Sequence, residues 1–298
     1  MLERLWIYQR ERFPLPAMAT LGLLLGSAAT LFSALVRGDA APAAWPICAA
    51  AASVFLVFLQ MRVFDEFKDF EDDVRFRPYR AVPRGLVSLA ELRGVLAVAS
   101  VAQVVIALAV DVRLLWLLAA LWGYLLLMAV EFFVPAWLRA RHFAYLASHI
   151  PFAGLIALYA AAFEWLPRRM DPHPALGLLA VAALFASTML EIGRKIRAPQ
   201  DEEAGVASYS RVWGRPAATA AWLAAFGLVV LFGMLAARAA GQAAIFIVLM
   251  APLAVLAALC GLRYLRRPEK ANRFEALSAV ASLALFAALG PLPVLLSV

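Results

Sequence analysis

Nine apolar segments of membrane-spanning length, separated mostly by short connections, constrain this chain more than any other feature. A helix needs about 20 mostly apolar residues to cross the hydrocarbon core of a bilayer. The sequence is 65% hydrophobic and only 16% charged, whereas soluble domains are nearer half apolar and a quarter charged. We therefore predict an all-α integral membrane protein, with about nine transmembrane helices in one bundle around a central cavity. The predicted spans are 16–36, 43–61, 94–110, 114–134, 143–163, 174–190, 217–237, 243–262 and 276–298.

The basic residues are distributed unequally between the two sides of the predicted bundle. Of the 27 Lys and Arg residues, 22 lie in the leader or in connections on its side, and 5 lie on the opposite side. Cytoplasmic connections carry an excess of Lys and Arg. We therefore expect a multi-pass protein of the cell inner (plasma) membrane, with its N-terminus in the cytoplasm. The same asymmetry accounts for the net charge of +7, so the expected partner is the lipid bilayer and not nucleic acid.

Little of the chain lies outside the spans, which predicts a single domain over residues 1–298. Residues 1–15 can form a short amphipathic helix at the membrane interface. Two connections on the inner side, 62–93 and 191–215, are longer than the rest and dense in charge. We expect these two segments to form cytoplasmic caps that carry the chemistry. Cys48 and Cys260 both fall within apolar segments, so the sequence offers no disulfide framework or cysteine metal site.

The first charged connection contains six carboxylates within nine residues, 65–73. If the second span continues through them as one helix, Asp65, Asp69 and Asp73 share a face, because a four-residue step advances only about 40° around the axis. Carboxylates at this spacing repel one another and are costly at the hydrocarbon boundary without a neutralising partner. Mg²⁺ is usually held by one or two carboxylates together with substrate phosphates. The cluster therefore suits a Mg²⁺-bound diphosphate.

A second interpretation of this cluster stays open from the residues alone. The acids can instead end a solvated helix, with their charges paired to Arg62, Lys68 and Arg75.

The cluster is followed by a basic turn-forming segment, "RAVPRGLVS", from Arg80 to Ser88. Together they resemble the first signature of the UbiA superfamily of intramembrane prenyltransferases, Asn-Asp-x2-Asp-x3-Asp and then Arg-Pro-x-Pro-x-Gly-x2-Ser. Asp65 stands at the usual Asn, Glu66 at the usual Asp, and Ala81 at the first proline. These exchanges preserve the oxygen ligands.

The second charged connection resembles the end of the family's second signature, through Gly205-x2-Ser208 and the later Gly214-Arg215 pair. In this alignment Asp201 occupies the position of the last aspartate of the signature. The two earlier aspartates of the signature are missing, and basic residues stand at their positions. Arg presents a bidentate fork to phosphate, and Lys a point charge. We hypothesise that these residues, Arg194, Lys195 and Arg197, do part of the work of a second metal. Alternatively, they serve only the membrane topology.

The resemblance implies a Mg²⁺-dependent transfer of an isoprenyl group, from an isoprenoid diphosphate to an aromatic or other lipophilic acceptor, at the cytoplasmic side. From this resemblance, and from the hypothesis above for the basic residues, we assign catalysis to four aspartates, metal binding to these and three glutamates, and diphosphate binding to six basic residues. The catalytic residues are Asp65, Asp69, Asp73 and Asp201; the added metal ligands are Glu66, Glu191 and Glu202; the diphosphate-binding residues are Lys68, Arg80, Arg84, Arg194, Lys195 and Arg197.

Two other functions remain as alternatives. A terpene cyclase of the same superfamily would ionise an allylic diphosphate and capture the cation within the donor itself. A non-enzymatic transporter would spread its carboxylates in depth along the spans. Here nearly all acids lie at the inner ends of the spans, which favours an enzyme.

Overall fold

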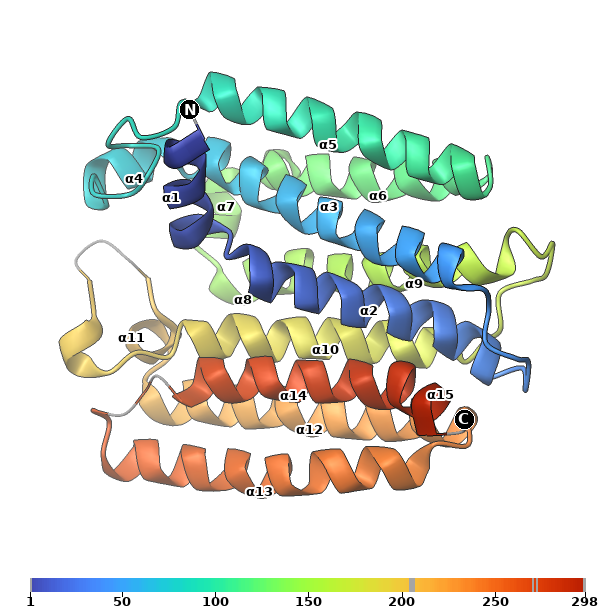
Figure 1. The fold of residues 1–298 in the computed structure, drawn as a ribbon. Helices are drawn as coiled ribbons and strands as arrows, with labels where there is room; N and C mark the ends of the chain where they lie inside the picture. Colours follow the sequence, from blue (N-terminus) through green and yellow to red (C-terminus); the bar gives the residue numbers. More distant parts are fainter. Residues whose placement is uncertain (1, 204–206, 270, 272, 297–298) are drawn as a thin grey trace.

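The computed structural model describes residues 2–203, 207–269, 271 and 273–296, and this part of the chain is helical with no strand. The long helices lie side by side in one bundle (Figure 1). Seven are long and apolar enough to cross a membrane. The prediction of an all-α integral membrane protein is therefore confirmed. The seven are α2 (Leu15–Leu35), α3 (Ala44–Lys68), α5 (Leu89–Val110), the α8–α9 pair (His142–His149 and Pro151–Trp165), α10 (Leu176–Arg194), α12 (Arg215–Ala239) and α13 (Ala243–Arg266).

Two further helices lie alongside these seven but are shorter than the predicted spans. Helix α6 (Leu114–Ala129) stops early because the backbone of the next turn, η1 (Glu131–Phe133), is left-handed. The last predicted span is divided at Gly290 into α14 (Arg273–Leu289) and α15 (Pro291–Leu296). The count of nine spans and the orientation in the membrane remain predictions.

A proline divides the fifth predicted span. Helix α8 ends at His149 and α9 begins with Pro151, whose ring has no backbone N–H to donate to the preceding turn. The whole segment from His142 to Trp165 still has 24 residues, enough for one crossing.

A buried polar network joins four helices inside the bundle. The indole Nε1 of Trp122 on α6 donates to the side-chain oxygens of Gln60 on α3 at 3.2 Å and of Gln103 on α5 at 3.1 Å. Gln103 donates in turn to the backbone oxygen of Ser53, whose hydroxyl lies 2.9 Å from that of Tyr159 on α9. Such interhelical hydrogen bonds hold membrane helices in register.

Close backbone contact fixes α2 against α3. A side chain at Gly26 would place its Cβ 2.5 Å from the Cα of Ala51, so only glycine permits this approach. Near the other end of α2, the buried carboxylate of Glu164 accepts from Ser33 at 2.7 Å and from Arg37 at 3.0 Å. One of the few outer-side cations thus serves to neutralise a buried acid.

Five of the short helices gather at one end of the bundle, which we call the motif end, whereas α15 lies at the other. They are α1 (Leu2–Arg12), α4 (Phe70–Phe76), α7 (Pro135–Arg139), η2 (Pro199–Asp201) and α11 (Tyr209–Val212). Figure 1 shows the N-terminus at this end and the C-terminus at the other. The charged segments after α3 and α10 therefore lie at the same end of the molecule, although more than a hundred residues separate them.

Candidate active site

The first acidic cluster begins where α3 ends. Asp69 lies between α3 and α4 with φ −91° and ψ 3°, so the prediction of one unbroken helix through the cluster is wrong at this residue. The helical hydrogen bonds nevertheless continue, from Asp69 N to Asp65 O at 2.9 Å and from Asp73 N to Asp69 O at 2.8 Å. The three aspartates therefore remain one turn apart along a bent helical path.

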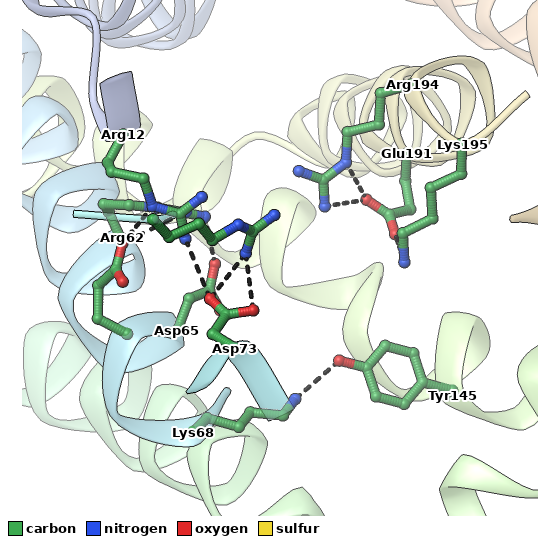
Figure 2. A network of polar contacts seen from close by, with 11 residues as sticks. Arg12, Arg62, Asp65, Lys68, Asp73, Tyr145, Glu191, Arg194 and Lys195 are labelled. Atoms are coloured by element: carbon green, nitrogen blue, oxygen red, sulfur yellow. Dashed lines mark hydrogen bonds and ion pairs between the residues drawn. The ribbon is translucent and has the colours of Figure 1, made fainter. Parts of the chain in front are cut away.

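Guanidinium groups neutralise the two most deeply buried acids of this cluster. Glu66 and Asp73 are only 2% and 1% exposed. Nε of Arg12 lies 2.6 Å from Oε1 of Glu66, and Nη1 of Arg80 lies 2.8 Å from Oδ2 of Asp73 (Figure 2). Arg77 adds a contact of 3.2 Å to Asp73. A buried carboxylate is tolerated when it is paired in this way.

The more exposed acid, Asp65, is paired with Arg62 at 2.6 Å. Of the partners considered from the sequence alone, Arg62 therefore does neutralise the cluster. Lys68 instead contacts residues of other helices, and Arg75 lies over the ring of Phe76, 4.9 Å from its centroid.

Asp69 differs from its neighbours because its carboxylate makes no hydrogen bond or ion pair within the described residues. Burial raises the pKa of Asp69 above its ordinary value, and the negative charges of Asp65 and Asp73 raise it further. The site therefore has an uncompensated need for positive charge at this position.

Mg²⁺ is the metal that the sequence leads us to expect at these acids. No three His, Cys, Asp or Glu side chains converge on a preformed metal site within the described ranges. Mg²⁺ does not require one, because it usually keeps several waters and takes one or two carboxylates plus substrate phosphates. The unpaired carboxylate of Asp69, with Asp65 one turn away, fits that mode of binding.

The second half of the site does not fit a metal. Glu191 on α10 is paired with Arg194 and, at 2.7 Å, with Lys195. Figure 2 shows this trio across from the first cluster, and Arg194 lies near enough to Asp65 for their charges to interact. The hypothesis that the basic residues do part of the work of a second metal stays a prediction. Arg194 and Lys195 do lie across from the first cluster, where Glu191 already balances part of their charge.

The remaining predicted residues of the second half form a cap. Glu202 accepts hydrogen bonds from the hydroxyls of Ser208 and Ser210, at 2.6 and 2.9 Å. Arg197 donates to Glu203 at 2.7 Å and to the backbone oxygen of Asp201 at 3.0 Å. Asp201 itself is exposed. Gly205, which carried part of the resemblance, lies outside the described residues.

One hydrogen bond joins the two caps directly. The hydroxyl of Tyr79, in the first cap, donates to Oε2 of Glu203, in the second, at 3.1 Å. Arg197 and then Tyr79 hold the pKa of Glu203 below its ordinary value, so this carboxylate stays ionised and able to accept at neutral pH. Arg84, in contrast, points away from the acids and pairs with Glu11 at 2.8 Å.

The structure adds Glu131, Tyr145, His149 and Arg12 to the site, none of which was assigned to it from the sequence. Nζ of Lys68 donates to the hydroxyl of Tyr145 at 2.7 Å and lies 3.3 Å from Oε1 of Glu131. The ring of Tyr145 stacks on that of His149, with centroids 4.1 Å apart. Arg12 is the other addition. The sequence shows an Arg-rich N-terminal segment around Arg12, but no local pattern predicts that α1 packs near the end of α3.

The model of the UbiA prenyltransferase family matches residues 26–288 of this chain. The chain belongs to that family. The recognition made from the two motifs is therefore confirmed, and the protein is a membrane prenyltransferase. The match covers the bundle and both caps, while α1 precedes it.

Two solved structures share this fold. A UbiA homolog from Aeropyrum pernix K1, in its apo form, has a TM-score of 0.71 at 17% identity, over 91% of this chain and 96% of its own. A digeranylgeranylglyceryl phosphate synthase has a TM-score of 0.60 at 18% identity, over 96% of this chain and 99% of its own. No curated protein matches the sequence. At these identities the likeness shows the fold alone.

Proposed function

We propose that this prenyltransferase moves an isoprenyl group from an isoprenoid diphosphate to an aromatic or other lipophilic acceptor, at the motif end of the bundle. The observation that carries the proposal is Asp69, a half-buried carboxylate with no hydrogen bond or ion pair to any described residue, across from the basic trio at Glu191. A Mg²⁺-bound diphosphate supplies both charges that this arrangement needs. It brings a cation to Asp69 and phosphate oxygens to Arg194 and Lys195.

Asp65 and Asp69 are the proposed first ligands of Mg²⁺, with Glu66 and Asp73 next to them. When bound, Mg²⁺ stabilises negative charge on the departing diphosphate. Arg80 holds Asp73 in place, with its Nη1 at 3.1 and 2.8 Å from the two carboxylate oxygens. Burial and the neighbouring cations Arg12 and Arg77 lower the pKa of Arg80, but arginine remains protonated at neutral pH. It can therefore also bind phosphate oxygens.

The proposed reaction breaks the allylic C–O bond, and its electron pair leaves with the diphosphate. The acceptor then forms a new bond to the allylic carbon and releases a proton. Tyr145 and His149 present stacked rings beside Lys68, and Phe132 lies against His149 with centroids 5.9 Å apart. Aromatic faces attract a neighbouring cation, so we assign these rings to the path of the allylic carbon.

The test uses the purified full chain in nanodiscs with Mg²⁺ and a series of isoprenoid diphosphates. Thermal stabilisation by at least one diphosphate, and prenylated product when a lipophilic aromatic acceptor is added, are expected. Absence of both across the series would contradict the proposal. A hydrocarbon formed from the donor without acceptor would instead indicate a terpene cyclase.

We further propose that the motif end faces the cytoplasm, in the inner (plasma) membrane. The charge asymmetry of the sequence supports this orientation. A single cysteine can be placed at the exposed Glu71 or at the opposite end at Ala41, after Cys48 and Cys260 are replaced. In intact cells a membrane-impermeant maleimide should label Ala41→Cys and spare Glu71→Cys. The reverse pattern would overturn the orientation.

A further inference from the structure

Arg12 enters the carboxylate site from an element outside both motifs. It is the last residue of α1, and its Nε lies 2.6 Å from Oε1 of Glu66, 54 positions further along the chain. Its Nη2 also lies 3.9 Å from Oδ2 of Asp73. Among the described residues Glu66 has no other cation as close, since Arg62 is 3.9 Å away. Arg12 is thus the main counter-charge of a buried acid in the first motif.

The other cations of the cluster differ from Arg12 because they lie close in sequence to the acids that they contact. Arg62, Arg77 and Arg80 lie within seven residues of the acids that they contact, on the same segment. Their pairing is therefore a local property of the motif. The contact of Arg12 with the acids depends instead on where α1 packs.

Helix α1 is fastened by ion pairs at its two ends and by an apolar cluster between them. Arg4 lies 2.9 Å from Glu91, and Glu11 lies 2.8 Å from Arg84. Tyr8, only 5% exposed, packs in a cluster with Leu92 of α5. An apolar hollow of about 550 Å³ borders α1, α3 and α5 beside this cluster. These contacts set the position of α1, and with it the distance from Arg12 to Glu66.

We propose that Arg12 is the resident counter-cation of the first motif and competes with Mg²⁺ for Glu66. The position of α1 would then control the affinity of the site for Mg²⁺. The inference rests on the Mg²⁺ role assigned under the proposed function. The physical reason is that a guanidinium and a divalent cation need the same carboxylate lone pairs. Once buried, such a carboxylate requires one of them.

The experiment is a calorimetric titration of the purified full chain in nanodiscs with Mg²⁺ alone, without donor or acceptor. Arg12→Gln should bind Mg²⁺ about tenfold more tightly than the wild type, because close charge pairs are coupled by at least that factor. Arg12→Lys keeps the competing charge and should stay near the wild type. Arg10→Gln is the matched control, since Arg10 is exposed on the same helix and has no partner among the described residues.

An equal Mg²⁺ affinity for Arg12→Gln, Arg10→Gln and the wild type would overturn the inference, as would no binding by any of them. Hydrogen exchange on the unmutated chain guards against a folding defect in Arg12→Gln. Saturating Mg²⁺ should speed exchange of the α1 amides several-fold, and unchanged exchange would also overturn the inference. The titration contains no diphosphate, so it does not depend on prenyl transfer. If Arg12→Gln bound Mg²⁺ more tightly while the wild type formed no prenylated product in its own assay, only the proposed function would be contradicted.

Discussion

Nζ of Lys68 lies 3.3 Å from Oε1 of Glu131, and this ion pair joins the end of α3 to the turn after α6. Glu131, Phe132 and Phe133 all have positive φ, between 48° and 61°. Non-glycine residues adopt this region at an energetic cost. The turn is therefore held in a strained form that keeps the Glu131 carboxylate buried beside the first motif.

Lys68→Met should destabilise the protein by about 1.5–3 kcal/mol, because it leaves the buried carboxylate of Glu131 with only the more distant Arg139, 3.9 Å away, among the described residues. The double variant Lys68→Met with Glu131→Gln should recover part of that loss, since the amide carries no charge. Thermal unfolding in detergent measures both. A double variant no more stable than Lys68→Met would show that the pair is not coupled.

Asp69→Asn should abolish prenyl transfer and also raise the stability of the metal-free protein. Its carboxylate has a raised pKa because of burial and the charges of Asp65 and Asp73, so the ionised form opposes folding and its removal relieves that cost. Asp72→Asn is the control, since Asp72 is exposed and unpaired in the described structure. Product assays and unfolding without divalent cation measure the two effects. Retained activity in Asp69→Asn would remove Asp69 from the site.

Arg194→Ala should weaken donor binding, whereas Arg197→Ala should loosen the second cap. Arg194 lies beside Glu191 and faces Asp65, so its loss should raise the KM for the donor diphosphate about tenfold, the effect of one charge-assisted contact. Arg197 holds Glu203 and the backbone of Asp201, so its loss should speed hydrogen exchange in the second cap. Donor titrations and exchange measurements separate the two outcomes. If both variants raised KM equally, Arg197 would also belong to the diphosphate site.

Trp122→Phe should cost about 1–2 kcal/mol of stability, because Gln60 and Gln103 lose the indole N–H that joins them inside the bundle. Trp116→Phe is the matched control, since Trp116 is 80% exposed on the same helix. Thermal unfolding in detergent compares them. Equal unfolding temperatures for the two variants would mean that the network adds nothing to stability.

The sequence by itself predicted the membrane bundle and the family. The spans could be predicted because hydrocarbon requires long apolar helices whatever their neighbours, and Asp65 to Asp73 could be recognised because their spacing is local. The predicted span limits failed where backbone conformation intervened, as in the left-handed turn at Glu131, before which α6 ends at Ala129. Helix–helix contacts such as that of Trp122 with Gln60 and Gln103 also left no local pattern, because residues on separate helices meet only after packing.

The tertiary structure alone decided which charges of the site are compensated. The sequence placed an acidic cluster and a basic cluster near the ends of two spans, but pairing between separate elements depends on their packing. That packing joins Arg12 to Glu66 and Tyr79 to Glu203, and it leaves Asp69 without a partner. A buried charge needs a partner of opposite charge, and residues on separate elements become neighbours only when those elements pack. The sequence therefore showed the residue types of the site but not the pairs between separate elements.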